Sequence, residues 1–189
     1  MIYAHTGFLN YVNFFNKKKF LNLNKKNLDF YLQKMLLDLR NISKNNLIIP
    51  TYNYDFGRKK IFNVEKDISH VGSFSEFFRK KFIKNRTKIP FFSSCSIKKR
   101  KLLSGNKLDV FGKNSEFSFL IKQKGNIINF GSQFAPTFII FIESNLPGGI
   151  LYRYTKKFEG IIENKKKKEK IIIYYQVRPL NINITYDLN

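Results

Sequence analysis

The sequence predicts an α+β protein with two amphipathic helices in the N-terminal half and an antiparallel sheet of about six strands in the C-terminal half. Two observations carry this prediction. Apolar side chains recur at helical spacing in two stretches before residue 85. Beyond residue 115, short apolar runs alternate with turn residues, which is the pattern of strands and hairpins. The chain has 189 residues, 43% of them apolar, which suffices for one domain with a hydrophobic core.

The first helix is predicted from Leu28 to Ile42, because its apolar residues fall at helical spacing and Asp29 lies in its first turn. The second helix is predicted to begin at Ser73. With Ser73 as N-cap, Glu76 completes a capping box three residues later. A stripe of phenylalanines then extends this helix to about Lys84.

The strands are predicted from alternating or continuous apolar runs. A turn at Gly125–Asn126 separates the first two, and the charged residues 164–169 form the tip of a hairpin between the last two. The continuously apolar run among them is expected to be a buried strand. The predicted strands are Glu116–Lys122, Ile127–Phe130, Thr137–Glu143, Ile150–Tyr154, Phe158–Glu163 and Lys170–Val177.

The chain is predicted to consist of an N-terminal aromatic and basic arm, residues 1–27, and a single α+β domain, residues 28–189. The start of the arm is apolar and aromatic without a clear period, so it could dock on a partner or on the body of the protein. Pro90 excludes a helix beyond the second one. A basic extended segment is therefore predicted over residues 85–107.

Positive charge is the most unusual property of the chain. Lys and Arg number 35 against 13 Asp and Glu, for a net charge of +22. Residues 77–108 hold 11 of the basic residues and no acidic one, which is half of the net charge. Self-repulsion of this kind opposes a compact state unless a polyanion neutralises it, and a nucleic acid is the leading explanation.

The basic stretch has the composition of an RNA contact, because Phe82, Phe91 and Phe92 lie among its lysines and arginines. In an extended segment the cations can follow a phosphate backbone, while the rings stack on unpaired bases or anchor the segment to the fold. The alternative is a solvated run of charge. Lys165–Lys168 and Lys170 give a weaker signal, because three glutamates surround them.

The predicted RNA-binding residues lie in three regions of the chain. They are Lys17, Lys18, Lys19, Lys25, Lys26, Arg58, Lys59, Lys60, Arg79, Lys80, Lys81, Lys84, Arg86, Lys88, Lys98, Lys99, Arg100, Lys101 and Lys107.

No catalytic residue, cofactor or metal ion is predicted. The chain has two histidines and one cysteine, Cys95, without the spacings of zinc ligands. Glycine-based phosphate-binding and nucleophile motifs are absent. The carboxylates are scattered, with Glu65 and Asp67 the closest pair before the C-terminal tail, whereas a metal-dependent nuclease needs a third. An enzyme is therefore not expected.

Residue usage points to an organelle genome. Phe, Tyr, Met, Ile, Asn and Lys, which AT-rich codons encode, make up 105 of 189 residues, whereas Gly, Ala, Arg and Pro make up 24. Folding physics does not disfavour Ala, so mutational pressure explains this bias. No apolar run approaches the ~20 residues of a transmembrane segment, and no secretory or transit pattern begins the chain. We expect an organelle-encoded protein of the mitochondrial matrix.

In composition, size, charge and mixed architecture, with a basic strand such as Arg79–Lys101, the chain resembles the organelle-encoded ribosomal proteins of AT-rich protists, ciliate mitochondria being one source. The resemblance is to the class, and no particular ribosomal family is matched. It implies a structural component of a mitochondrial ribosome whose partners are rRNA and neighbouring ribosomal proteins. It implies no small-molecule substrate and carries over no catalytic residue.

Two other classes stay open. One is a matrix-side accessory subunit of a respiratory or ATP synthase complex, with lysines touching anionic lipid headgroups and an apolar N-terminal arm. The other is an RNA-processing enzyme or cofactor, such as a degenerate maturase. It would need a carboxylate cluster that the sequence does not display.

Overall fold

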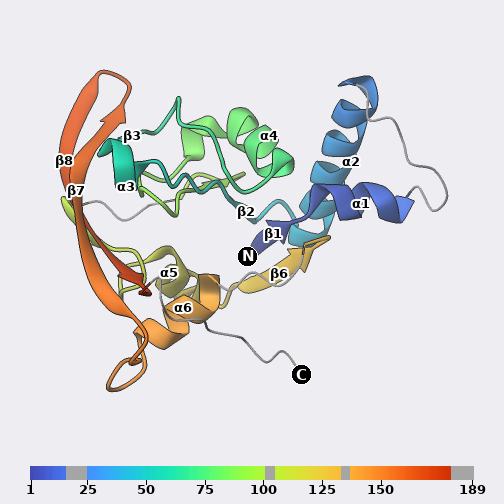
Figure 1. Cartoon of the computed structure of the whole chain (residues 1–189). Helices are drawn as coiled ribbons and strands as arrows, with labels where there is room; N and C mark the ends of the chain where they lie inside the picture. The colour runs from blue at the N-terminus through green and yellow to red at the C-terminus, as the bar shows by residue number, and fades with distance from the viewer. Residues whose placement is uncertain (16–24, 101–104, 133–136, 180–189) are drawn as a thin grey trace.

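The computed structural model describes residues 1–15, 25–100, 105–132 and 137–179. Within these residues the protein has three layers: a group of helices, a first sheet and a second sheet that contains a long, curved hairpin (Figure 1). One hydrophobic cluster lies between the helices and the first sheet, and a second cluster lies between the two sheets.

The first sheet has the strand order β4-β2-β1-β6. Its strands are β1 (Ile2–Thr6), β2 (Leu47–Pro50), β4 (Ser94–Ser96) and β6 (Asn126–Phe130). β1 lies inside the sheet, parallel to β2 and β6, and β4 runs antiparallel to β2. Parallel strands of this kind are covered on both faces, and the two hydrophobic clusters provide that cover.

Three helices pack on one face of the first sheet: α1 (Phe8–Phe15), α2 (Lys25–Ser43) and α4 (Ser73–Lys81). Ala4, Ile49 and Cys95 point from the strands into this layer, because side chains alternate between the faces of a strand. They share a cluster with Met35 of α2 and Phe78 of α4, both fully buried.

The second sheet has the order β3-β7-β8-β5. Its strands are β3 (Ile61–Asn63), β7 (Tyr154–Asn164), β8 (Lys167–Val177) and β5 (Lys107–Asp109). β7 and β8 pair antiparallel over their whole length, which confirms the predicted C-terminal hairpin, and β3 and β5 run parallel to its two edges. Of the predicted strand Ile150–Tyr154, only Tyr154 belongs to a strand.

The hairpin crosses the short helix α3 (Phe56–Lys59) at very close range. A Cβ atom at Gly160 would lie 2.2 Å from the carbonyl oxygen of Lys60 and 2.7 Å from the ring of Phe56. Only glycine permits this approach, which seats the hairpin against the body of the protein.

The core between the sheets is largely aromatic and is completed by α5 (Glu116–Lys122) and α6 (Thr137–Ser144). Tyr3 of β1 forms a hydrogen bond of 2.8 Å between its hydroxyl group and that of Tyr52. Burial raises the pKa of both tyrosines, so this pair stays neutral at physiological pH.

The predicted fold class holds in its coarse form, since the protein mixes helices and strands. The finer prediction is wrong: the strands form two mixed sheets of four instead of one antiparallel sheet. The described part of the N-terminal half contains four α-helices instead of two. The predicted helix at residues 28–42 lies within α2, and the predicted strand at residues 127–130 lies within β6.

The predicted capping box of α4 is also wrong. Gly72, with a φ of 105°, is the N-cap, and Ser73 is the first helical residue. The helix ends at Lys81, earlier than predicted, and a 3-10 turn, η1 (Ile83–Asn85), follows it.

Two segments predicted as strands are helices. Glu116–Lys122 is α5, whose N-cap Ser115 accepts a hydrogen bond from the backbone N–H of Ser118. Thr137–Glu143 lies in α6, where Phe138 and Phe141 stack one helical turn apart, with ring centroids separated by 5.7 Å. Short apolar runs do not distinguish a buried strand from a buried helix, so here the packing of these rings decides.

The first 15 residues lie within the body of the protein. β1 is an inner strand with Tyr3 and Ala4 fully buried, and α1 packs through Phe8 and Tyr11. The sequence allowed this segment to dock on a partner or on the body of the protein, and the structure shows it docked on the body.

We predict that His5 makes stability sensitive to mild acid. Its side chain is buried, its Nε2 atom has no hydrogen-bond partner among the described residues, and burial lowers its pKa to about 4. Since the unfolded state then binds a proton that the folded state excludes, the free energy of unfolding decreases as pH falls below about 6.5.

Between about pH 7.5 and about pH 5.5 this loss amounts to about 1 kcal/mol. Urea denaturation at both pH values measures it. His5→Phe should reduce the loss by that amount, because phenylalanine fills similar space without titrating. Equal losses in the two proteins would contradict the assignment.

Candidate nucleic-acid interface

The basic stretch predicted to bind RNA runs largely through the protein interior. Nearly every residue from Arg86 to Ser96 is buried. Phe91 and Phe92 belong to the core between the two sheets, where Phe91 packs edge-on against Phe56 with ring centroids 5.5 Å apart. The sequence allowed these rings to stack on unpaired bases or to anchor the segment to the fold. The packing of Phe91 and Phe92 in the core shows that they anchor it.

Arg86 lies at the centre of this segment and is 4% exposed. Its Nη1 atom donates to the carbonyl oxygens of Val64 at 3.0 Å and Asp67 at 2.5 Å, and its Nη2 atom donates to that of Thr51 at 3.0 Å. Its Nε atom donates to the hydroxyl group of Ser93 at 3.2 Å. Burial lowers the pKa of Arg86 to about 10, so the group keeps its charge at neutral pH.

The other two arginines of the stretch are buried in ion pairs. Arg79 forms a two-point pair with Glu76, both contacts at 2.7 Å, and donates to the carbonyl oxygen of Glu65 at 2.7 Å. Arg100 pairs with the buried carboxylate of Glu116. All three guanidinium groups are thus occupied by protein acceptors, so none of them is free to bind a phosphate group directly.

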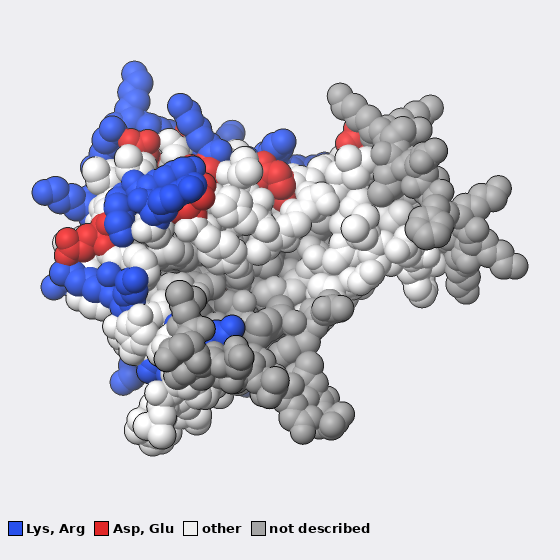
Figure 2. Space-filling view, in the orientation of Figure 1, with Lys and Arg blue, Asp and Glu red and all other residues white. Residues whose placement is uncertain are grey.

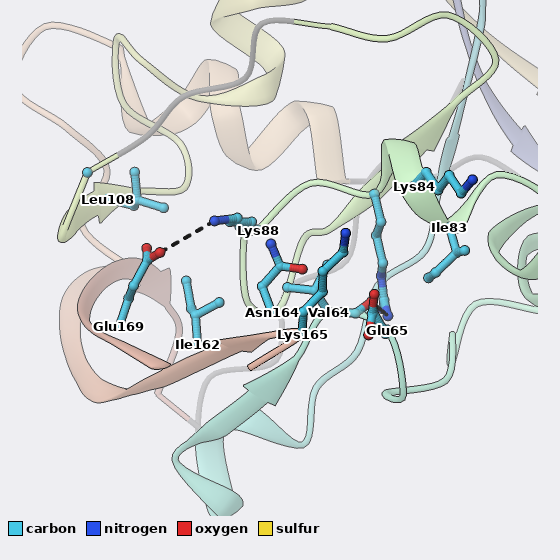
Figure 3. A pocket seen from close by; sticks show the side chains of 12 residues that line it. Val64, Glu65, Ile83, Lys84, Lys88, Leu108, Ile162, Asn164, Lys165 and Glu169 are labelled. Carbon is cyan, nitrogen blue, oxygen red and sulfur yellow. Dashed lines mark hydrogen bonds and ion pairs between the residues drawn. The ribbon is translucent and has the colours of Figure 1, made fainter. Parts of the chain in front are cut away.

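The lysines of the stretch that the structure describes lie at the surface, and two of them border a pocket. The pocket has a volume of about 470 Å³ and lies between residues 83–88, the chain after β3 and the tip of the β7–β8 hairpin (Figure 3). Lys84 and Lys88 line it from one side and Lys165 from the hairpin. The fold therefore brings together basic residues that are about 80 positions apart in the sequence.

The remaining lining is aliphatic and amide-bearing, with two carboxylates. The register of the hairpin explains this mixture. Ile162, on the inner face, stands opposite Glu169, and Asn164 stands opposite Lys167, so this face turns polar where the hairpin extends past the core. Val64, Ile83 and Leu108 supply the rest of the aliphatic lining.

The cations around the pocket differ in whether they are neutralised. Lys88 pairs with Glu169 at 3.5 Å, as Figure 3 shows, and Lys168 pairs with Glu163 at 2.9 Å. Lys84, Lys165 and Lys166 are exposed and make no ion pair with any described residue. We call these three lysines the free lysines. They can donate hydrogen bonds to phosphate groups without losing a protein partner.

Basic side chains gather on the side of the molecule that carries the hairpin tip. Figure 2 shows them over the region of β3, β7, β8 and α4, whereas the side chains drawn in colour or white over α1 and α2 are mostly uncharged. The pocket that Lys84 and Lys165 line lies at the tip of this hairpin, and Lys166 follows Lys165 in the turn. A polyanion can therefore contact several cations at once without spanning the whole protein.

Four other predicted residues are exposed and bound to protein groups: Arg58, Lys59, Lys80 and Lys81. Asp55 pairs with Arg58 at 3.6 Å and with Lys59 at 2.6 Å, and the hydrogen bond from Lys59, with the positive charge of these neighbours, lowers the pKa of the Asp55 carboxyl group. Glu76 pairs with Lys80 at 3.8 Å, and Gln33 accepts a hydrogen bond from Lys81 at 3.2 Å. Exposed pairs of this kind are weak and can rearrange on binding.

Another four predicted residues are exposed and make no ion pair with the described part of the chain: Lys60, Lys98, Lys99 and Lys107. Lys17, Lys18, Lys19 and Lys101 lie outside the described residues. Lys25 and Lys26 begin α2, but their side chains are not among those described.

Sequence reasoning left out Lys165, Lys166 and Asn164. In the sequence Lys165 and Lys166 give a weaker signal, because glutamates surround them. In the structure Glu163 and Glu169 pair with Lys168 and Lys88 instead, which leaves the two lysines of the turn unpaired. The predicted hairpin could have indicated this, because side chains at the turn do not lie beside the carboxylates on the strands.

Over 1–15, 25–100, 105–132 and 137–179, no three His, Cys, Asp or Glu side chains are close enough to hold a metal ion. In the same ranges no helix has the length and apolarity needed to cross a membrane. Cys95 is buried, and burial raises the pKa of its thiol to about 11, so the thiol stays protonated and inert.

The contrast between buried arginine and exposed lysine gives a paired prediction. Arg86→Met should lower the free energy of unfolding by about 3 kcal/mol or more, since it removes the donor to several buried acceptors. Lys88→Met, two positions away, should change it by less than about 1 kcal/mol, because its ion pair is exposed.

Urea denaturation of the two variants, followed by far-UV circular dichroism, measures both effects. Similar losses for the two substitutions would show that Arg86 is not the structural group described here.

No protein-family model matches the chain, and no curated protein is significantly similar to it. The arrangement of the basic side chains and the composition of the chain are therefore the grounds for assigning a function.

Proposed function

We propose that the protein is a structural rRNA-binding component of a mitochondrial ribosome, and that the basic side around the pocket contacts the rRNA. The observation that carries this proposal is the convergence of Lys84 and Lys165, from two distant parts of the sequence, on one pocket, with Lys166 next to Lys165 in the hairpin turn. A net charge of +22 supports it, because rRNA phosphates would relieve the repulsion among these charges.

The buried arginine adds to the attraction. Arg86 lines the pocket, and its partners are carbonyl and hydroxyl oxygens instead of a carboxylate. Its charge is therefore not cancelled, and it raises the electrostatic potential of the pocket although the group itself is tied to the protein.

The ribosomal part of the proposal rests on the class resemblance in size, composition and charge, and the mitochondrial part on the AT-rich residue usage. In this role the protein carries out no reaction. It occupies rRNA phosphates with its lysines and packs its exposed body against RNA and neighbouring ribosomal proteins.

Gradient sedimentation tests the proposal. A detergent-solubilised lysate of cells that make the protein is fractionated with and without RNase, and the protein is followed by mass spectrometry. We expect migration with an rRNA-containing particle that RNase abolishes. Migration with a respiratory or ATP synthase complex, unaffected by RNase, would overturn the proposal and identify the protein as an accessory subunit.

A charge-removal variant tests the face. Lys84→Gln, Lys165→Gln and Lys166→Gln together should weaken binding to purified rRNA by about tenfold or more at moderate salt, because three phosphate contacts are lost. The slope of log affinity against log salt concentration should fall in magnitude by about 2 to 3. Fluorescence anisotropy over a salt series measures both quantities.

The matched control removes equal charge elsewhere: Lys44→Gln, Lys122→Gln and Lys124→Gln, all exposed and none lining the pocket. Its affinity and salt slope should stay close to those of the unmodified protein. Equal weakening in both variants would mean that RNA binds through overall charge and not through this face.

A further inference from the structure

We infer that the pocket receives a single unpaired nucleotide of the bound RNA, with the base among the aliphatic side chains and its phosphate on Lys84 and Lys165. This inference rests on the proposed RNA-binding function and specifies the form of RNA that the protein recognises. Its grounds are the residues that line the pocket and the protein partners that the charged groups of the pocket already have.

The pocket has the size and the lining for a nucleobase. Its volume of about 470 Å³ lies in the range of pockets that hold small molecules, about 300–1,000 Å³. Val64 and Ile162 are almost completely buried, and Ile83 and Leu108 are partly buried, so one wall of the pocket is aliphatic. A phosphate group alone would leave this wall in contact with water.

Polar groups suited to a base edge stand beside that wall. Asn164 lines the pocket, and its side-chain amide can both donate and accept a hydrogen bond. The Glu65 carboxylate lines the same pocket and can accept from an exocyclic amino group. A carboxylate at this position opposes the binding of an isolated anion, yet it suits a ligand that presents amino groups as well as a phosphate.

The cations determine where the phosphate binds. Lys88 is engaged by Glu169, and Arg86 is engaged by protein oxygens, which leaves Lys84 and Lys165 available. These two lysines come from different elements, η1 and the hairpin turn (Figure 3). A backbone phosphate between them would position its own base over the aliphatic wall.

An enclosed base must be out of a duplex, so the inference predicts a preference for single strands. A paired base would first have to unpair and unstack, which costs free energy that a single strand is largely spared. We expect the full-length protein to bind a single-stranded RNA 12-mer about tenfold or more tightly than a duplex of the same sequence.

The experiment compares these two RNAs by fluorescence anisotropy, with a central 2-aminopurine in the single strand as a second readout. Its fluorescence should rise severalfold on binding, because the base leaves its neighbours for a wall without aromatic rings. Two variants, Asn164→Leu and Ile83→Trp, alter the pocket and keep every lysine. Each should abolish the preference and the fluorescence increase, while the salt slope stays unchanged.

Each outcome has a defined meaning. Equal affinity of the unmodified protein for single strand and duplex, or an intact preference in both variants, would overturn the pocket inference and leave the proposed function standing if RNA still binds steeply with salt. Absence of salt-dependent binding to either RNA would overturn the proposed function itself. Urea denaturation of both variants establishes that they fold, and inorganic phosphate and nucleoside monophosphates as competitors separate a nucleotide site from an anion site.

Discussion

The buried guanidinium group of Arg86 is the interaction on which the rest of the structure depends. It bonds to Thr51, next to β2 of the first sheet, and to Val64, next to β3 of the second. It thereby joins the two sheets at the point where the basic segment passes between them. A charge in this position is stable only because four oxygen acceptors surround it.

Arginine and lysine have separate roles in this protein. Four of its seven arginines have side chains no more than 7% exposed, namely Arg79, Arg86, Arg100 and Arg153, and each is bound to protein acceptors. The planar guanidinium group reaches several acceptors at once and loses less hydration on burial than an ammonium group. Lysine is four times as frequent, and the lysines whose side chains the structure describes remain at the surface. Net charge alone therefore overstates the number of cations available to a partner.

The sequence predicted the features that depend on local periodicity or composition. The helix around Met35 and the β7–β8 hairpin are examples, because their patterns are long enough to be unambiguous. It did not predict α6, because eight mostly apolar residues fit a strand and a helix equally well and only the stacking of Phe138 and Phe141 decides. It also did not predict the pocket. That site forms from residues 64–65, 83–88, 105–108 and 162–169, and no local pattern brings these four segments together.

The position of β1 has a consequence for the order of folding during translation. This strand is synthesised well before β6, yet Ile2 pairs with Asn126 and the sheet has β1 in its interior. The first sheet can therefore close only after the chain up to β6 has been made, and the second sheet needs the hairpin that follows. Such non-local pairing is slow, so the nascent chain exposes the apolar residues of β1 and α1 while the segment between β1 and β6 is made. A chaperone or the surface of an assembling particle has that interval in which to capture it.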